Sequence, residues 1–532
     1  MYYRLLSNQL TIDNKSVRII LENNALITIV QMEVKIVERV QALPLINEVN
    51  KKEVKKVKIM QFGEGNFLRA FVDWIINSMN KANVFDGGVV VVQPMPFGRC
   101  KELNEADGLY TLYLQGLQDG KAVREHEVIK CLQDFVNPFE AWDKYLEYAL
   151  SDDLEFIISN TTEAGIAFDP NDTDFSKCPN SYPGKLLALL KKRYEAGKKG
   201  LYIIPCELID YNGKALREVL IKLAKHNNMD EKFISWIENE NKFYNTLVDR
   251  IVPGYPRNEA VEFQLDLGYQ DQNMVVGEIF HLWCIDAQTV ACPECAKANL
   301  AELNAKFPCD KAGLNVLFVD SIVPYKQRKV KILNGSHTCL VPVSYLSGID
   351  TVRETIEDEQ LGAFVKEFIF DEVVPTIAIP RDQMVVYSNS VLERYMNPYV
   401  RHELMSIALN SVTKYKTRIL PSVIQNLEDL KNLPKHALFG LAALIVFYRG
   451  KRGEADIALA DDQWALDMFK ELWANFDGSK TACAKIVNAV LSLEKHWEVD
   501  LTKYEGVEAF VCDAVYEIVS TSVREALVKL VK

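Results

Sequence analysis

Three side chains near the middle of the chain have the chemistry needed to move a proton to and from a hydroxyl group. Residues 329–337 place a lysine, an amide and an imidazole at Lys329, Asn334 and His337. On an α-helix, which turns by about 100° per residue, these three fall within one arc of about 140°, and Lys331 points away from it. Lys326 shares the arc but lies further from the histidine, so it is the second choice.

The three groups match the steps of an alcohol oxidation. An uncharged lysine can accept the hydroxyl proton, an amide N–H can donate to the oxygen on which charge develops, and an imidazole can orient that oxygen. We therefore predict that Lys329, Asn334 and His337 are catalytic residues. Because this spacing is common on ordinary helices, the hypothesis also needs a binding site for a hydride carrier.

A glycine turn near the start of the chain could supply that site. Gly63-Glu64-Gly65 follows an apolar stretch typical of a strand and precedes a predicted helix. Glycine lets a pyrophosphate approach the backbone, and the free N–H groups of a helix N-terminus attract its charge. The third glycine of the usual fingerprint is replaced by Leu68, so a plain tight turn is the alternative. The predicted dinucleotide contacts are Phe62, Gly63, Gly65, Asn66, Phe67 and Arg69, of which Arg69 could contact a phosphate.

Two further strand ends are candidates for contacts to the same dinucleotide. Gln93 ends the second predicted strand, where an acidic residue usually binds the ribose hydroxyls. No acidic residue stands there, so this position leaves NAD and NADP both open. Asn160, Thr162 and Glu163 follow a later strand, at the sheet edge where the nicotinamide half of the cofactor usually lies. An ordinary turn with a helix cap is the alternative for these three.

Strands and helices alternate through the first half of the chain, which predicts a parallel, doubly wound sheet of Rossmann type. The apolar runs that read as buried strands are 57–62, 88–93, 154–159 and 201–205, and the runs that read as helices include 184–196 and 214–226. After residue 325 amphipathic segments typical of helices dominate, at 351–371, 397–411, 462–475, 483–494 and 507–531.

These patterns predict an α/β Rossmann-type domain followed by an all-α C-terminal domain. We expect a poorly specified N-terminal leader at residues 1–56, a dinucleotide-binding domain at 57–325 and a helical substrate domain at 326–532. The length of 532 residues agrees with more than one hydrophobic core.

The net charge of the chain limits the kinds of molecule that it is expected to bind. The formal net charge of −12 repels nucleic acid and anionic lipid, so neither is an expected partner. An anionic substrate would then need a local cluster of basic residues. The chain lacks a recognisable secretory signal, and its longest apolar run is too short to cross a bilayer, so we expect a cytoplasmic protein.

Eleven cysteines are spread along the chain, mostly singly and in apolar contexts, as in reduced core thiols. Cys292-Pro293-Glu294-Cys295 is the exception. Its spacing could belong to a zinc site or a redox pair, but no second cysteine pair or histidine pair follows at the usual distance. A surface helical insertion is the favoured interpretation, and no metal is predicted.

The glycine turn together with Lys329, Asn334 and His337 resembles the polyol-specific long-chain dehydrogenases, the mannitol dehydrogenase family. Two further stretches, 107–111 and 248–253, resemble the same family, and the resemblance covers roughly residues 57–530. It implies a Rossmann-type domain that binds NAD (NADH), a helical C-terminal domain and lysine acid–base chemistry without a catalytic metal. Residues 206–213 and 397–404 resemble members that interconvert D-altronate and D-tagaturonate in hexuronate breakdown. Fructuronate or mannitol as substrate remains the alternative, as does a dinucleotide-sensing regulator without catalysis.

The resemblance also suggests roles for single residues. It implies that Lys329 is the general acid and base, that Asn334 donates to the oxyanion and that His337 orients the substrate. Mannitol-type members carry a second asparagine where this chain has Leu208, so Asn212 is the remaining candidate for that role. Asp249 resembles an acidic residue near the family's active site, although an ion pair with Arg250 would also explain it.

A sugar-acid substrate would satisfy the need for a basic cluster. Positive charge in the helical domain comes from Arg401, His402, Lys414 and Arg418. A guanidinium binds a carboxylate bidentately, so Arg401 or Arg418 is expected to hold the substrate carboxylate. A solvated helix face is the alternative for each of these side chains.

Overall fold

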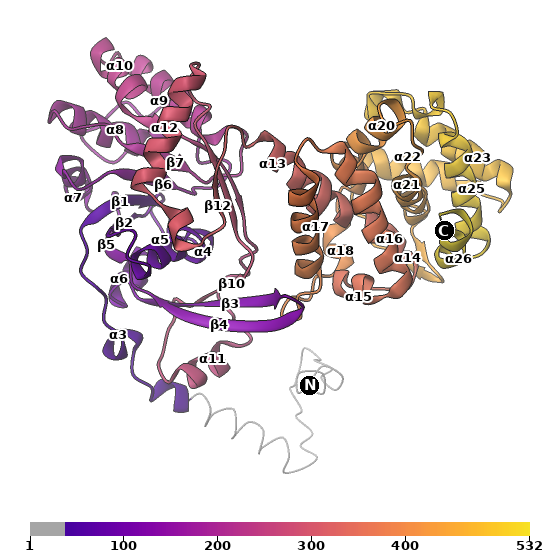
Figure 1. Cartoon of the computed structure of the whole chain (residues 1–532), viewed down its shortest axis with the longest axis horizontal. Helices are drawn as coiled ribbons and strands as arrows, with labels where there is room; N and C mark the ends of the chain where they lie inside the picture. The colour runs from indigo at the N-terminus through magenta and orange to yellow at the C-terminus, as the bar shows by residue number, and fades with distance from the viewer. Residues whose placement is uncertain (1–37, 532) are drawn as a thin grey trace, which may run out of the picture.

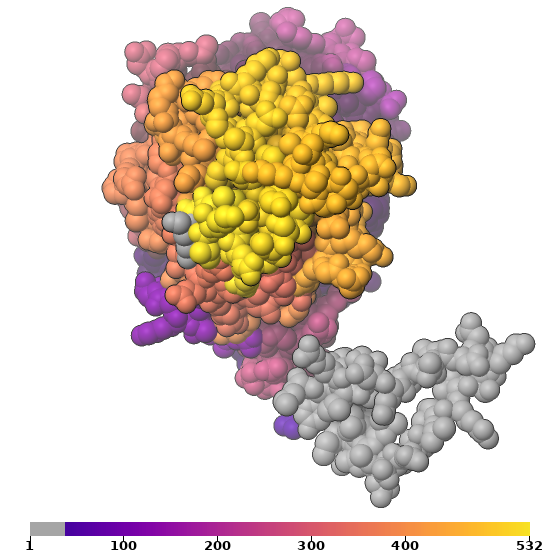
Figure 2. Space-filling model, turned by 90° about the vertical axis from the view of Figure 1, so that its right-hand side faces the viewer, coloured from indigo at the N-terminus to yellow at the C-terminus, as the bar shows by residue number. Residues whose placement is uncertain are grey.

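The computed structural model describes residues 38–531, and they form two lobes joined through α13 (Val323–Arg328; Figure 1). The first lobe is built around a sheet, and the second consists almost entirely of helices. The helical lobe stands in front of the sheet lobe when the molecule is viewed along its long axis (Figure 2). Most of the expected leader, residues 1–37, lies outside the described residues.

The central sheet of the first lobe has six parallel strands in the order β5-β2-β1-β6-β7-β8. Counted along the chain within this sheet, the order is 3-2-1-4-5-6, the doubly wound order of a dinucleotide-binding fold. The predicted parallel sheet is therefore confirmed. Its strands are β1 (Val57–Phe62), β2 (Gly88–Val92), β5 (Leu132–Val136), β6 (Phe156–Ser159), β7 (Tyr202–Pro205) and β8 (Lys242–Phe243).

Alternate residues of these strands enter two different hydrophobic cores, one on each face of the sheet. Val89 and Val91 pack into one core, whereas Val90 and Val92 pack into the other. A strand buried on both faces requires an unbroken apolar run, which explains the four consecutive valines. Helices that contribute to these cores are α5 (Val72–Lys81), α8 (Tyr182–Glu195), α9 (Asn212–His226) and α10 (Glu231–Glu240).

Two smaller sheets lie outside this pattern and were not predicted as such. One has the order β10-β3-β4 and contains an antiparallel hairpin; the other has the order β12-β11-β9 and mixes parallel and antiparallel pairs. Much of β4 is exposed and polar, so it lacks the apolar run of a core strand. The strands are β3 (Tyr110–Gln118), β4 (Lys121–Ile129), β9 (Asn245–Asp249), β10 (Val275–Glu278), β11 (Leu282–Asp286) and β12 (Val316–Phe318).

The second lobe surrounds α21 (Lys435–Phe447), which is buried from Ala437 to its end. This burial accounts for the longest apolar run of the sequence. None of the helices in residues 38–531 has both the length and the apolar character needed to span a membrane. Other helices of this lobe are α14 (Gly335–Leu346), α15 (Val352–Glu357), α16 (Glu359–Glu367), α17 (Arg381–Tyr395), α19 (Ser411–Arg418), α20 (Leu420–Glu428), α22 (Gln463–Ala474), α23 (Lys480–Leu491), α25 (Val507–Ser520) and α26 (Val523–Leu530).

The helix predicted at 397–411 is wrong. Only α18 (Leu404–Ile407) forms there, and the rest is irregular. Pro398 disfavours the helical conformation of Asn397, and Asn410 adopts a left-handed conformation with φ of 51° before α19 begins. The irregular segment places His402 beside the helix that follows Lys329, as described below.

The segment that carries the predicted catalytic residues is not a regular α-helix. Residues Lys329–Asn334 form a π-helix between α13 and α14. A π-helix bonds each residue to the fifth along the chain, so Lys329 and Asn334 are brought to one side on adjacent turns. The angular positions expected from an α-helix are therefore wrong for this pair, although the pair does share a face.

Candidate functional site

The glycine turn lies at the point of the central sheet where the strand order reverses. Gly63 follows β1 with a φ of 115°, and its N–H donates to the carbonyl oxygen of Val92 on β2 at 3.0 Å. A Cβ on Gly63 would lie 2.9 Å from the carbonyl oxygen of Asn160, which follows β6. The turn therefore needs glycine both for its backbone conformation and for the close approach of the neighbouring loop.

Gly65 provides open space next to this tight turn. It is the N-cap of α4 (Asn66–Ala70), has no side-chain cap, and a Cβ built on it meets no atom of the described part of the chain within 4 Å. Uncapped N–H groups at a helix N-terminus beside an open surface, at the switch point of a doubly wound sheet, suit a dinucleotide pyrophosphate. The residues present thus fit the expected cofactor.

Several side chains predicted to contact the cofactor have other partners. Arg69 is only 1% exposed, and its guanidinium donates to the carbonyl oxygen of Glu64, to the side-chain oxygen of Asn66 and to the carbonyl oxygen of Asn273. The expectation that Arg69 binds a phosphate is therefore wrong, because its buried guanidinium donates its hydrogen bonds to protein oxygen atoms and so stabilises the turn. Phe62 is buried in the core, and Phe67 stacks on Phe71.

The end of β2 borders a surface cavity of about 410 Å³ on the side of the sheet where the adenosine half of a dinucleotide would lie. Gln93 lines it, but its amide donates to the carbonyl oxygen of Met95 and accepts from the N–H of Cys100. The side chain is 4% exposed and shapes the loop that follows the strand.

A chain of contacts leads from the glycine turn to a second, larger cavity. Asn160 donates to the carbonyl oxygen of Cys206 at 2.7 Å, so the loop after β6 is bound to the loop after β7. Glu207 strengthens this link by accepting hydrogen bonds from the hydroxyl groups of Ser159 and Thr161 and from the N–H of Thr161. Thr162, with φ of 73°, and Glu163 are exposed at this edge.

The second cavity has a volume of about 490 Å³ and lies between the two lobes. Its walls come from the loop after β7, from β9, and from α13 with the π-helix. Lys329 and Asn334 both line it, and so does Lys326, which pairs with Asp210. The sequence-predicted lysine and amide therefore share a concave site, as a substrate pocket requires.

Lys329 is held at the cavity wall by β9. Its ammonium lies 3.1 Å from the carbonyl oxygen of Val248 and 3.4 Å from the carboxylate of Asp249. Arg394 of α17 donates two hydrogen bonds to Asp249, at 3.1 and 3.2 Å, and two more to Glu278 at the end of β10. We call Lys329, Asp249, Arg394 and Glu278 the lysine cluster.

Charge and burial act against each other in the lysine cluster. Burial raises the pKa of Asp249, but Arg394 and Lys329 lower it by more, so this carboxyl group titrates below its ordinary range. For Glu278 burial prevails, and its pKa is raised despite Arg394. Arg250 takes no part, because its guanidinium donates to the carbonyl oxygens of Ala70, Ile279 and Phe280. The alternative of an Asp249–Arg250 ion pair is therefore wrong.

His337 lies one turn beyond Asn334, but it lines a separate small pocket with Arg394, Tyr395 and His402 and not the cavity that contains Lys329. Its ring packs against that of Tyr395 in a tilted arrangement, with centroids 4.3 Å apart, and meets His402 edge-on at 5.0 Å. Its Nε2 is buried and has no hydrogen-bond partner among residues 38–531. Burial, aided by the nearby His402 and Arg394, holds the pKa of His337 well below its ordinary value, so the ring is neutral near pH 7.

Asn212 does not reach the cavity. Its side chain is fully buried, and its amide nitrogen donates to the carbonyl oxygens of Pro205, Glu207 and Thr246 and to the hydroxyl of Thr246. These partners leave no N–H for a substrate oxygen. We therefore assign Asn212 a structural role, contrary to the expectation that it completes an oxyanion hole.

The four basic candidates for a substrate carboxylate differ in position. Arg418 is half-buried and donates to the hydroxyl of Thr338 at 3.2 Å, next to Asn334. His402 lies against His337, and Lys414 donates to the carbonyl oxygen of Ile407. Arg401 is 68% exposed and pairs with Glu403. Arg418, His402 and Lys414 therefore lie close enough to His337 to lower its pKa, whereas Arg401 belongs to the surface.

Sequence reasoning missed Arg394, Glu278 and Glu207, which connect the elements of the site. Glu207 and Glu278 are 2% and 4% exposed, and the side chain of Arg394 is 5% exposed. Each pairs with a residue more than forty positions away along the chain. Arg394 stands directly before Tyr395 in a helix of mixed polarity, so no local pattern distinguishes it. For Arg394, the only signal in the sequence was a charged residue on the side of α17 that faces the protein interior.

Comparison with known proteins places both lobes in one family. Residues 57–296 match the mannitol dehydrogenase Rossmann domain, and residues 321–519 match the mannitol dehydrogenase C-terminal domain. The altronate oxidoreductase of Yersinia enterocolitica is 43% identical over 88% of this chain and 96% of its own length. That of Escherichia coli O6:K15:H31 is 42% identical over 88% and 96%.

Solved structures share the fold. The substrate-free form of D-sorbitol dehydrogenase superimposes with a TM-score of 0.74 at 22% identity, covering 89% of this chain and 95% of that one. The ternary complex of Pseudomonas fluorescens mannitol 2-dehydrogenase with NAD and D-mannitol gives 0.60 at 21% identity, with 90% and 94% covered. With a sheet in dinucleotide-binding order, a helical second lobe and both family domains, this chain belongs to the mannitol dehydrogenase family.

Proposed function

We propose that this protein is an NAD-dependent oxidoreductase that interconverts D-altronate and D-tagaturonate. The observation that carries the proposal is the placement of Lys329 and Asn334 on one wall of the cavity between the lobes. The relatives named altronate oxidoreductase, at 42–43% identity over most of both chains, support this substrate.

The proposed cofactor site begins at the glycine turn. Gly63 allows the tight turn, Gly65 leaves room for the pyrophosphate, and the N–H groups of the first turn of α4 would neutralise part of its charge. Asn160 and Thr162 stand at the carboxyl end of β6, beside the link to the substrate cavity. Bound NAD supplies the acceptor for the hydride that leaves the carbinol carbon.

Lys329 is the proposed acid and base. In the oxidative direction its uncharged amine takes the proton of the substrate hydroxyl, and in the reductive direction its ammonium returns that proton to the oxygen. The amide of Asn334, one π-helical turn away, donates to the same oxygen while it carries negative charge. The carbonyl oxygen of Val248 and the carboxylate of Asp249 limit the directions in which the lysine can point.

Arg418 is the proposed partner of the substrate carboxylate. It lies beside Thr338 and Asn334, and Lys414 also lies near His337, so two basic side chains place positive charge near the reacting groups. A local field of this kind would overcome the net charge of −12 for an anionic substrate. The neutral ring of His337 would orient a sugar hydroxyl by a hydrogen bond from or to its unpartnered Nε2.

A substrate panel tests the proposal. The purified protein should oxidise NADH rapidly with tagaturonate and at least tenfold more slowly with fructuronate or fructose. A preference for fructuronate or fructose would overturn the substrate assignment but leave the family intact.

The variant Arg418→Met tests the role of the carboxylate partner. We expect kcat/KM for tagaturonate to fall by about 10- to 100-fold, the worth of one charge-assisted hydrogen bond. Arg401→Met is the matched control and should stay within about twofold of the wild type, because exposed ion pairs contribute little. Equal losses in both variants would contradict the assignment.

A further inference from the structure

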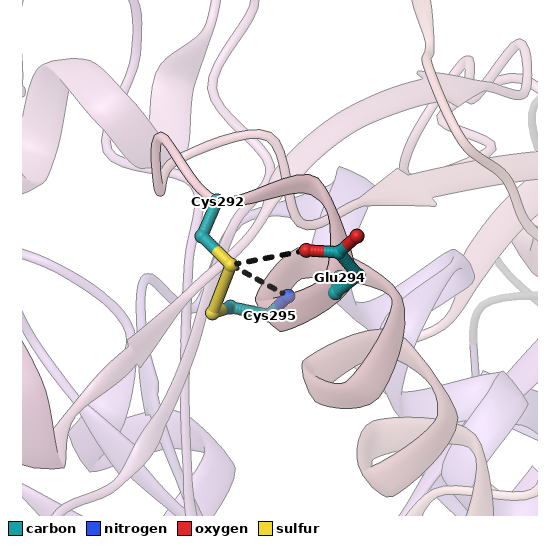
Figure 3. Close-up of a disulfide and its surroundings, with 3 residues drawn as sticks. All are labelled: Cys292, Glu294 and Cys295. Carbon is teal, nitrogen blue, oxygen red and sulfur yellow. Dashed lines mark hydrogen bonds between the residues drawn. A yellow bond between two sulfur atoms is a disulfide. The ribbon is translucent and has the colours of Figure 1, made fainter.

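A pair of cysteines stands at the surface of the first lobe, at the start of α12 (Pro293–Lys306; Figure 3). The sulfur atoms of Cys292 and Cys295 are bonded to each other, and their Cα atoms are 5.2 Å apart. Cys295 is exposed and Cys292 is half-buried. Solvent and small reagents can therefore reach both sulfurs, which is a requirement for redox chemistry at thiols.

The nine other cysteines of the chain differ from this pair. Eight of them are buried, and Cys178 is half-buried. Burial raises the pKa of these thiols, to about 12 for Cys100 and about 11 for Cys178, which disfavours the reactive thiolate. Reactivity toward disulfides and alkylating agents should therefore be concentrated at Cys292 and Cys295.

The environment of Cys292 combines a favourable and an unfavourable contact. Its sulfur is the N-cap of a fourteen-residue helix and accepts the N–H of Cys295 at 3.2 Å, which favours a negatively charged sulfur. The carboxylate of Glu294 lies 3.9 Å from the same sulfur and opposes that charge (Figure 3). Among residues 38–531 no group of three His, Cys, Asp or Glu side chains is placed so that it could hold a metal ion.

We propose that Cys292 and Cys295 form a redox-active dithiol that exchanges with low-molecular-weight disulfides. In the reduced protein the Cys292 thiolate attacks one sulfur of the disulfide, forms a mixed disulfide and releases one thiolate. The Cys295 thiolate then attacks the Cys292 sulfur, closes the internal disulfide and releases the second thiolate. Two protein thiols are oxidised, one external disulfide is reduced to two thiols, and the two protons pass to the released thiolates.

This site is separate from the proposed dehydrogenase reaction. Neither cysteine lines the cavity that contains Lys329. The single variants Cys292→Ser and Cys295→Ser should therefore keep turnover within about twofold of the wild type, and the redox test does not depend on the identity of the substrate.

Titration of the full-length protein with mixtures of reduced and oxidised glutathione, followed by alkylation and peptide mass measurement, tests the proposal. We expect the peptide with both cysteines to change as a unit from doubly alkylated to internally bonded, while Cys178 remains a thiol. Each single serine variant should instead carry one glutathione on the remaining cysteine. Glu294→Gln should speed alkylation of Cys292 by about two- to fivefold, because a repelling charge is lost.

Three results would overturn the proposal. Both cysteines could remain alkylatable in a large excess of oxidised glutathione, or each could carry its own glutathione without closing the internal bond. The bond could also persist after treatment with a strong dithiol reductant, in which case it is a structural crosslink.

Discussion

The glycine turn and the lysine cluster have different physical origins. The turn is made mainly by backbone: the φ of Gly63, its hydrogen bond to β2 and the open surface at Gly65. The lysine cluster is made by charged side chains from β9, β10, α17 and the π-helix, up to 145 residues apart. Ten consecutive residues can form a binding site from backbone groups. A cluster of buried charges instead requires that the fold bring side chains of opposite charge together from distant segments.

Each region contains a buried aspartate, and the two behave in opposite ways. Asp249 is paired with Arg394 and Lys329, and its pKa is lowered. Asp73, in the helix α5 beneath the turn, is fully buried and accepts a hydrogen bond from Tyr110, but forms no ion pair within the described part of the chain. Burial raises the pKa of Asp73 to about 7. Burial opposes ionisation of both carboxyl groups, and the cations that the fold brings near decide whether the net pKa is lowered, as in Asp249, or raised, as in Asp73.

The largest expected effect comes from Lys329→Ala. This variant should lose about 10²- to 10⁴-fold in kcat, the usual contribution of a general acid and base, while NADH binding measured by fluorescence stays within about twofold. Lys326→Ala is the matched control, because it removes another lysine from the same cavity without touching Asp249. Wild-type turnover in Lys329→Ala, or an equal loss in Lys326→Ala, would contradict the assignment.

Arg394→Met should disrupt the lysine cluster by removing the guanidinium that pairs with Asp249 and Glu278. Two buried carboxylates lose their guanidinium, so we expect about 3–5 kcal/mol less unfolding free energy and at least tenfold lower turnover. Arg524→Met removes a partly exposed ion pair with Asp358 and should cost less than about 1 kcal/mol. Urea unfolding of both variants measures the difference. Similar losses would mean that the lysine cluster is no more important for stability than a surface pair.

Gly65→Val should separate cofactor binding from folding. The φ of Gly65 is −67°, and the space around it is open, so valine should leave the unfolding midpoint within a few degrees. The same side chain would occupy space expected for the pyrophosphate, so the Kd for NADH should rise by about 10- to 100-fold. Gly65→Ala should give a smaller rise. An unchanged Kd in the valine variant would mean that the cofactor lies elsewhere.

The smallest effect is expected from Asp73→Asn and depends on pH. In the unfolded chain the carboxyl ionises near its ordinary pKa of 3.8, and in the folded protein near 7. Between these values the folded state keeps a proton that the unfolded state has lost, so unfolding free energy falls as pH rises. Asp73→Asn should abolish about 1–3 kcal/mol of that fall between pH 4 and pH 8, measured by urea unfolding. An identical pH dependence in the variant would show that Asp73 does not titrate in this range.

Local patterns predicted much of the first lobe. The boundaries of β1 match the apolar run at 57–62, and the valine-rich run at 88–93 forms β2 with one residue fewer. The valine-rich run was predicted as a strand buried on two faces, and the run at 57–62 as a short apolar strand before the glycine turn. The hairpin of β3 and β4 and the irregular segment at 397–411 were missed, because half-exposed strands and Pro-broken amphipathic segments give weak or misleading periodicity.

For the candidate site, some residues were predicted correctly and others were not. Lys329 and Asn334 share the cavity, as expected, although through a π-helix that the spacing alone does not reveal. Arg69 and Asn212 were assigned to ligands, but in the structure their polar atoms bind backbone carbonyl groups. A polar side chain in a motif has the same appearance in sequence whether it faces a ligand or a buried carbonyl.

By itself the sequence determined the strand–turn–helix around Gly63 and the division into an α/β part and a helical part, and it singled out Lys329 as the proposed acid and base. These features depend on residues close together along the chain, where apolar periodicity and glycine geometry act locally. Only the tertiary structure decided that Arg394 and Glu278 stand behind Asp249, that Arg418 and not Arg401 lies beside Asn334, and that Asn212 is structural. Those contacts join distant segments, and the strength of buried charge interactions depends on distances that exist only after the lobes have packed together.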